Sequence, residues 1–411
     1  MIKKRAFDFD VQVNKLAKVF KDKINTEITA NKTYNAVFSV AEKSGGAEFE
    51  IIAFEKDFIK YGDGVVNALK DANVKYSVLL ISVSDLNFKN PKKIFGIKSS
   101  EVIVLGGKQL ISYVLFYASM QTKNIHAVLT EPYLEGLLGN LVTVPDGGFF
   151  KSINVSKLKT IILDKSIISK ADESAVAYSY VKSISKFISL IDYKYALLTS
   201  EKTFNQVYYD RARLAMTLVA NINSFTNYIE VLTYASLLNA EVLYSSNVLS
   251  DGGQTNVAHV IELQLPSVDK GDAAYVAFDR VLKLYHAFFT NDFGDVLSVA
   301  DYNGDVAKLS KISSKEQNYF YNNLKIPSAK RIKIINKLLN VTRSGFKKET
   351  TELLKMLSLV KSTYLTLSNK KSVYAFKYVH LKNAVQLAPY LSSQTTVLTT
   401  IRDFGILNTL K

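Results

Sequence analysis

The sequence predicts an α/β domain with a parallel sheet, followed by an all-helical domain. Two patterns support this prediction: continuous apolar runs recur between residues 76 and 164, and helical periodicity replaces them after Asp164. Continuous rather than alternating apolar runs indicate strands that are covered on both faces, as in parallel sheets. With 48% hydrophobic side chains in 411 residues, the chain can bury more than one core.

The first fifty residues read as a short α+β extension. A helix is expected over 11–23, and strand-like stretches at 36–41 and 48–54 flank a Ser-Gly-Gly turn, which indicates a hairpin. We therefore expect an extension over 1–50, a parallel-sheet domain over 51–165 and a helical domain over 166–411.

The α/β part contains four apolar runs that are separated by segments long enough for helices or loops. These runs are YSVLLISV, EVIVLG, IHAVLT and KTIILD, and each predicts a buried strand. After them come long stretches with helical spacing, including SAVAYSYVKSISKFISLIDYKYALL and YVAFDRVLKLYHAFF. The change from one pattern to the other places the expected domain boundary near 165.

The composition excludes several classes of site. Without cysteine, the chain has no disulfide, no thiolate metal site and no cysteine nucleophile. The first residues, MIKKRAFDFD, carry charges where a signal peptide needs an apolar stretch, and no segment has the ~18 apolar residues of a membrane span. We expect a cytoplasmic protein without a membrane span.

Most of the formal charge of +15 lies in one part of the chain. Residues 301–411 hold 19 Lys and Arg against 6 Asp and Glu, and the run 325–348 contains no acid. Such a run can bind nucleic acid or an acidic partner. It can also be the solvated face of a helix, which Ile332, Ile335, Leu338 and Leu339 favour by their spacing. Lysine also outnumbers arginine, the usual bidentate reader of phosphates and bases, which disfavours nucleic acid.

A strand, a glycine turn and a helix are predicted in EVIVLGGKQLISYVLFYA. This arrangement can place a helix N-terminus against a phosphate. The stretch resembles the glycine-rich cofactor loop of the family that comprises sn-glycerol-1-phosphate dehydrogenase, dehydroquinate synthase and iron-containing alcohol dehydrogenases. Gly106 and Gly107 match that loop, and Lys108 stands at its third glycine. HAVLTEPYLEGLLGN resembles a second loop of the family, in which Thr130 matches and Glu135 replaces an aspartate. The resemblance implies a Rossmann-like domain and NAD(P) as the cofactor.

The helical part resembles the same family in order along the chain. Asp164, Ile167, Lys186 and Asp192 match the segment that follows the dinucleotide domain, and HLKNAVQLAPYLSSQTTVLTTIRDFGILN is similar to the C-terminus of glycerol-1-phosphate dehydrogenases. At the three positions that hold the metal in the family, this chain has Lys182 for an aspartate, Thr255 for a histidine and Lys270 for another histidine. His259 matches a second histidine near Thr255.

These replacements favour a protein that holds no metal, because a protonated lysine has only N–H donors. The two ammonium groups could instead bind an anion, or they could pair with carboxylates such as Glu135 or Asp272.

The resulting expectation is a catalytically degenerate homologue that acts as a binding, assembly or structural protein, and a homo-oligomer. The alternatives are a divergent NAD(P)-dependent oxidoreductase of the glycerol-1-phosphate dehydrogenase type, and a basic nucleic-acid-associated protein.

Overall fold

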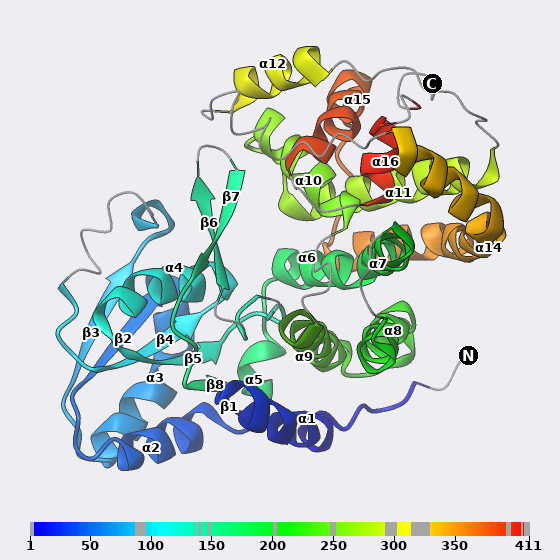
Figure 1. Ribbon diagram of the computed structural model, residues 1–411. Coiled ribbons are helices and arrows are strands. Elements are labelled where there is room, and N and C mark those ends of the chain that lie inside the picture. Colours follow the sequence, from blue (N-terminus) through cyan, green and yellow to red (C-terminus); the bar gives the residue numbers. More distant parts are fainter. Residues whose placement is uncertain are drawn as a thin grey trace. The chain divides into compact units, whose positions relative to one another are not determined.

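The computed structural model describes residues 4–86, 96–134, 136–138, 141–146, 149–199, 204–246, 252–291, 302–313, 329–391, 396–403 and 406. The chain divides into two compact units. The first is drawn from Met1–Pro145, Phe150–Ser179 and Thr217–Ser245, and the second from Asp146–Phe149, Tyr180–Met216 and Ser246–Lys411. Figure 1 shows the strands in the blue-to-teal part of the chain and the helices that follow them.

The first unit is built on a six-stranded sheet in the order β1-β8-β5-β4-β2-β3, and every neighbouring pair is parallel. Its strands are β1 (Glu27–Thr29), β2 (Phe49–Phe54), β3 (Tyr76–Ile81), β4 (Glu101–Gly106), β5 (Asn124–Leu129) and β8 (Thr160–Ile162). All four apolar runs of the α/β part are therefore strands, and the predicted Rossmann-like parallel sheet is confirmed. The chain changes direction across the sheet between β2 and β4, and such switch points open a crevice at the carboxyl ends of the strands.

Helices cover both faces of this sheet (Figure 1). On one face, α2 (Thr33–Lys43) and α3 (Glu55–Asp71) pack against the fully buried side chains of Ile51, Ile103 and Val128. On the other lies α4 (Lys108–Ala118), which is buried along most of its length because its sequence is apolar nearly all round. The other elements assigned mainly to this unit are α1 (Phe9–Ile24), β6 (Leu141–Asp146), β7 (Phe149–Asn154), α5 (Lys165–Ile168) and α9 (Tyr228–Ser246).

The N-terminal helix is present as predicted, but the predicted hairpin is wrong. Residues 36–41 belong to helix α2, and only the second stretch, β2, is a strand. Thr33, Ala36, Val37 and Ala41 are buried at helical spacing, so this segment gains more by packing one face on the sheet than by pairing as a strand. Gly45 and Gly46 adopt positive φ angles of 66° and 85°, and they turn the chain from the helix into β2.

The second unit is helical, which confirms the all-helical prediction for the later part of the chain. It contains α7 (Lys186–Thr199), α10 (Gly253–Gln264), α11 (Lys270–Thr290), α12 (Tyr302–Ile312), α14 (Ala329–Leu367), α15 (Tyr378–Leu387) and α16 (Val397–Asp403). Two more helices, α6 (Glu173–Ile184) and α8 (Gln206–Ala220), contribute residues to both units. Over the described residues, no helix is both long enough and apolar enough to span a membrane.

The basic run at 325–348 leads into α14, a helix of 39 residues. Residues 325–328 and the side chain of Ile332 lie outside what the structure describes. Further along, Ile335 and Leu339 are buried, Leu338 is half-buried, and Lys337, Lys347 and Lys348 are exposed. From Ile335 on, α14 therefore has the predicted amphipathic pattern, with Lys337, Lys347 and Lys348 on its solvated side.

The core of the second unit contains a carboxyl group that is held by hydrogen-bond donors. Asp192 on α7 is completely buried and accepts hydrogen bonds from the backbone N–H groups of Gly253 and Val397, both at 2.8 Å. The Tyr285 hydroxyl donates to both oxygens, at 2.9 and 3.1 Å. One side chain thus joins α7 to α10, α11 and α16.

Candidate functional site

The glycine turn of the first unit has the predicted strand–turn–helix geometry. Gly106 ends β4, and α4 begins at Lys108. The Thr130 N–H donates to the Gly106 carbonyl at 3.2 Å, so the structure brings together all four candidate cofactor residues, Gly106, Gly107, Lys108 and Thr130. The Lys108 ammonium lies over the ring of Tyr133, with Nζ 4.7 Å from the ring centroid.

A carboxyl group that sequence reasoning missed lies at this turn. Glu131 accepts a hydrogen bond from the backbone N–H of Lys108, at the first turn of α4. Its carboxyl group is so close to Gly107 that a Cβ atom added there would overlap it. Burial raises the pKa of Glu131, and the hydrogen bond from Lys108 opposes this effect. The helix N-terminus that could receive a phosphate therefore already holds an acid of the chain itself.

The only sequence signal for this arrangement is that Glu131 directly follows Thr130. An acidic residue after a strand is common in loops, so its position against Gly107 depends on how two distant turns pack together.

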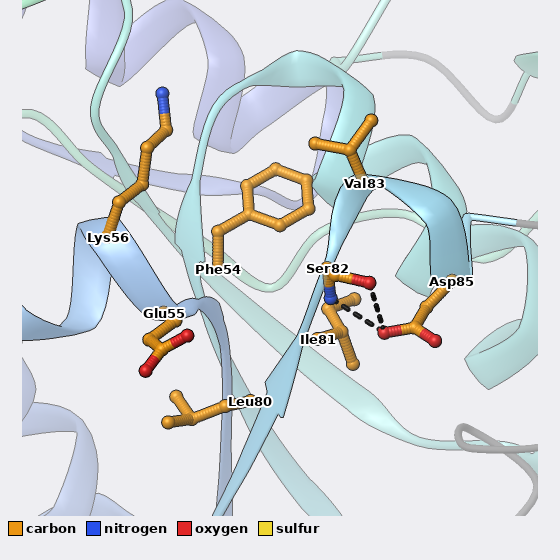
Figure 2. Close-up of a pocket in the computed structure, with 8 residues that line it drawn as sticks. All are labelled: Phe54, Glu55, Lys56, Leu80, Ile81, Ser82, Val83 and Asp85. Atoms are coloured by element: carbon orange, nitrogen blue, oxygen red, sulfur yellow. Dashed lines mark hydrogen bonds between the residues drawn. The ribbon is translucent and has the colours of Figure 1, made fainter.

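A pocket of about 350 Å³ lies at the carboxyl ends of β2 and β3. Its lining residues are Phe54, Glu55, Lys56, Leu80, Ile81, Ser82, Val83 and Asp85 (Figure 2). Figure 2 shows the Phe54 ring extending toward Val83, while the Asp85 carboxylate accepts 2.7 Å hydrogen bonds from the N–H and the hydroxyl of Ser82. The pocket is lined by apolar side chains together with two carboxylates and one lysine.

In the second unit, two of the predicted metal-site positions are in direct contact. The Lys182 ammonium, on α6, donates to the Thr255 hydroxyl on α10 at 3.2 Å, and both side chains are buried. His259 lies one turn after Thr255 on the same helix and is half-buried. Thr255 and His259 share one face of α10, because residues four apart are neighbours on a helix.

The fourth position, Lys270, is the first residue of α11 and is exposed. Its charge nevertheless acts on Glu262, and so does that of Lys182: burial raises the pKa of Glu262, and both lysines lower it. Sequence reasoning missed Glu262, although it lies seven residues after Thr255 and therefore faces the same way on a helix.

Of the two carboxylates that the sequence offered as partners for these lysines, Glu135 lies outside the described residues. Asp272 has other partners: it accepts hydrogen bonds from the Tyr364 hydroxyl at 2.7 Å and from Lys370 at 3.0 Å. Glu262 is instead the carboxylate whose pKa both lysines lower.

The residues at these positions do not fit a divalent cation. Lys182 places an ammonium group beside Thr255, and a protonated amine offers no lone pair to a metal. His259 is an imidazole donor and Glu262 a carboxylate donor, but a stable site needs at least three such ligands around one point. Within the described ranges, no group of three or more His, Cys, Asp and Glu side chains is placed to hold a metal ion.

Comparison with models of protein families gives no match, and comparison with curated protein sequences gives none either. Solved structures do match along nearly the whole chain. They define the class of fold as that of the iron-containing alcohol dehydrogenases, an α/β part followed by a helical part.

An archaeal halo-thermophilic alcohol dehydrogenase from a Red Sea brine pool matches with a TM-score of 0.58 and 12% identity, over 92% of this chain and 96% of that one. An iron-containing alcohol dehydrogenase from Thermotoga maritima matches with a TM-score of 0.54 and 10% identity, over 89% and 98%. A probable glycerol dehydrogenase from Sinorhizobium meliloti gives 0.55 and 9%, over 93% and 97%. At these identities the likeness shows the fold, and function must be argued from the site.

Proposed function

We propose that this chain is a catalytically degenerate homologue of glycerol-1-phosphate dehydrogenase-like enzymes, which works as a binding, assembly or structural protein. The observation that carries the proposal is the buried hydrogen bond from Lys182 to Thr255. The resemblance assigns these two positions to an aspartate and a histidine that hold the metal. A cation of the chain itself now lies where a metal-binding carboxylate would be needed.

In metal-dependent dehydrogenases the ion polarises the substrate hydroxyl while hydride moves to or from the nicotinamide. Among the residues that the structure describes, the side chains around Lys182 do not supply that ion with three donors. The Glu131 carboxyl group supports the same proposal from the first unit, because it occupies the turn that would otherwise approach a dinucleotide pyrophosphate. Two separate features of the chain thus disfavour a nicotinamide-dependent reaction.

The proposal includes an anion rather than a cation as the ligand of the helical unit. Lys182 and Lys270 both act with their positive charge on Glu262. Two ammonium groups near each other suit a small anion such as phosphate or a carboxylate.

Metal analysis tests the proposal directly. After dialysis without a chelator, the purified chain is expected to hold less than one zinc or iron ion per chain, and to oxidise neither NADH nor NADPH in the presence of dihydroxyacetone phosphate. The matched control is the triple variant Lys182→Asp, Thr255→His, Lys270→His, which restores the residue types of the family and should retain more metal than the unmodified chain. One tightly held ion per chain of the unmodified protein would overturn the proposal, and steady nicotinamide oxidation would decide for the alternative, a divergent oxidoreductase.

A further inference from the structure

The C-terminal part of the chain contains fifty consecutive residues without an acid. No Asp or Glu occurs from 353 to 402, whereas this stretch contains seven Lys and Arg. Its first part is the end of α14, and its last part is α16. Between them, residues 371–382 lead into α15 and form its first turn, and we call them the aromatic-basic segment.

The aromatic-basic segment exposes large side chains that would ordinarily be buried. Tyr374 is 53% exposed and Tyr378 66%, and Val379 beside it is 52% exposed. The rings of Tyr374 and Phe376 lie edge to face, with centroids 4.9 Å apart. More than half of each tyrosine is therefore accessible to a partner that stacks on aromatic rings.

Lysines alternate with these rings. Lys371, Lys377 and Lys382 are all exposed, and in the part of the chain that the structure describes none of the three is ion-paired. Lys370, directly before the segment, is different because it binds the carboxylates of Asp269 and Asp272 at 3.2 and 3.0 Å. The charge of the segment itself is therefore available to a partner.

The segment is attached to the helical unit through its backbone. The Gln264 side chain, at the end of α10, donates to the His380 carbonyl at 3.1 Å and accepts from Asn383 at 3.4 Å. Ala384 and Leu387 are buried and anchor the rest of α15. The C-terminal end of the segment is thus held against α10, which reduces the conformational entropy lost when a partner binds there.

We propose that the aromatic-basic segment binds single-stranded nucleic acid, with bases stacking on Tyr374 and Tyr378 and backbone phosphates lying near Lys371, Lys377 and Lys382. Stacking platforms for single strands combine exposed rings with a basic track, and every base has a face that can stack. Lysine is a point charge that lacks the bidentate geometry of arginine, so we expect little sequence preference.

The exposed rings distinguish this segment from the basic face of α14. Over 329–348 the only aromatic residue of α14 is Phe346, and it is buried. Lysines 337, 347 and 348 on that helix therefore provide charge without stacking. The proposal shares no residue with positions 182, 255, 259 and 270, so it can fail or succeed independently of the proposed function.

Fluorescence anisotropy with a labelled 20-nucleotide oligo(U) tests the proposal. The full-length chain is expected to bind, and the variant Tyr374→Ala, Tyr378→Ala to bind at least ~10-fold more weakly, because stacking contributes strongly for each base. The variant Lys371→Gln, Lys377→Gln, Lys382→Gln should lower the salt dependence, log K against log salt, by about 2, as expected for three phosphate contacts. The matched control Lys337→Gln, Lys347→Gln, Lys348→Gln makes the same change in net charge. Its affinity for oligo(U) should stay within threefold of that of the unmodified chain. Circular dichroism verifies that the variants remain folded.

Three results would overturn the proposal. The first is no binding of oligo(U) at low salt. The second is binding that survives the double tyrosine variant, or that falls equally in the α14 control, since either would leave only non-specific charge. The third is binding to vesicles of anionic phospholipid but not to oligo(U), which would identify the segment as a membrane surface instead.

Discussion

Replacing Glu131 by alanine is expected to create affinity for a dinucleotide. In the unmodified chain the Glu131 carboxyl group lies against Gly107 and accepts the Lys108 N–H, so a pyrophosphate would meet both a steric obstacle and, when Glu131 is ionised, a like charge. Removing the side chain leaves the start of α4 and its N–H groups open to an anion. We expect NAD⁺ to bind the Glu131→Ala variant at least ~10-fold more tightly than the unmodified chain, a change of about 1.4 kcal/mol, by isothermal titration calorimetry.

The variant Glu131→Gln separates charge from space at this turn. The glutamine has nearly the same volume as the glutamate, so it still overlaps the place of a phosphate beside Gly107. The affinity of the Glu131→Gln variant for NAD⁺ should therefore be close to that of the unmodified chain. Only the smaller alanine at this position should raise the affinity. Equal binding of NAD⁺ by the unmodified chain and by Glu131→Ala would contradict this account of the turn.

The stability of the protein is expected to fall as the pH rises from 4 toward 7, because of Asp192. Burial raises the pKa of its carboxyl group from 3.8 to about 7, against the opposing hydrogen bonds from Gly253, Val397 and Tyr285. Between these two pKa values the folded chain holds a proton that the unfolded chain has released. Stability therefore decreases with pH across this window and levels off above it, by up to about 4 kcal/mol for a shift of this size.

An isosteric variant isolates the contribution of this one carboxyl group. The side chain of the Asp192→Asn variant cannot ionise. Between pH 4.5 and 7.5, the free energy of unfolding in urea should therefore fall by about 3–4 kcal/mol less in the variant than in the unmodified chain. At pH 4.5 the variant protein should be less stable than the unmodified chain. The NH₂ group of the asparagine would face the backbone N–H of either Gly253 or Val397, and both of these groups are donors. The same pH dependence in both proteins would mean that Asp192 is already ionised throughout this range.

Local patterns in the sequence identified much of the fold. The four apolar runs are strands, and those of β4, β5 and β8 are short and buried on both faces, conditions that leave a visible trace in the order of residues. The run of β3 was expected to be buried as well, but β3 lies at the edge of the sheet, where Val78 and Leu80 are exposed. The segment at 36–41 was assigned to a strand because Ala36, Val37, Phe38 and Val40 are compatible with either structure over so short a stretch. Its packing against α3 and the sheet, rather than its own propensity, makes it a helix.

For the candidate sites too, some features follow from the sequence and others only from the tertiary structure. The sequence by itself determined that Gly106 and Gly107 form a turn before a helix, and that lysine and threonine stand at positions 182, 255 and 270, because identity and local geometry are properties of neighbouring residues. Only the tertiary structure placed Glu131 against Gly107 and Glu262 close enough to Lys182 and Lys270 for their charges to lower its pKa. It also surrounded the buried carboxyl group of Asp192 with three hydrogen-bond donors. Each of these contacts depends on burial and on residues far apart in the chain, and electrostatic interactions become strong only where packing has removed water.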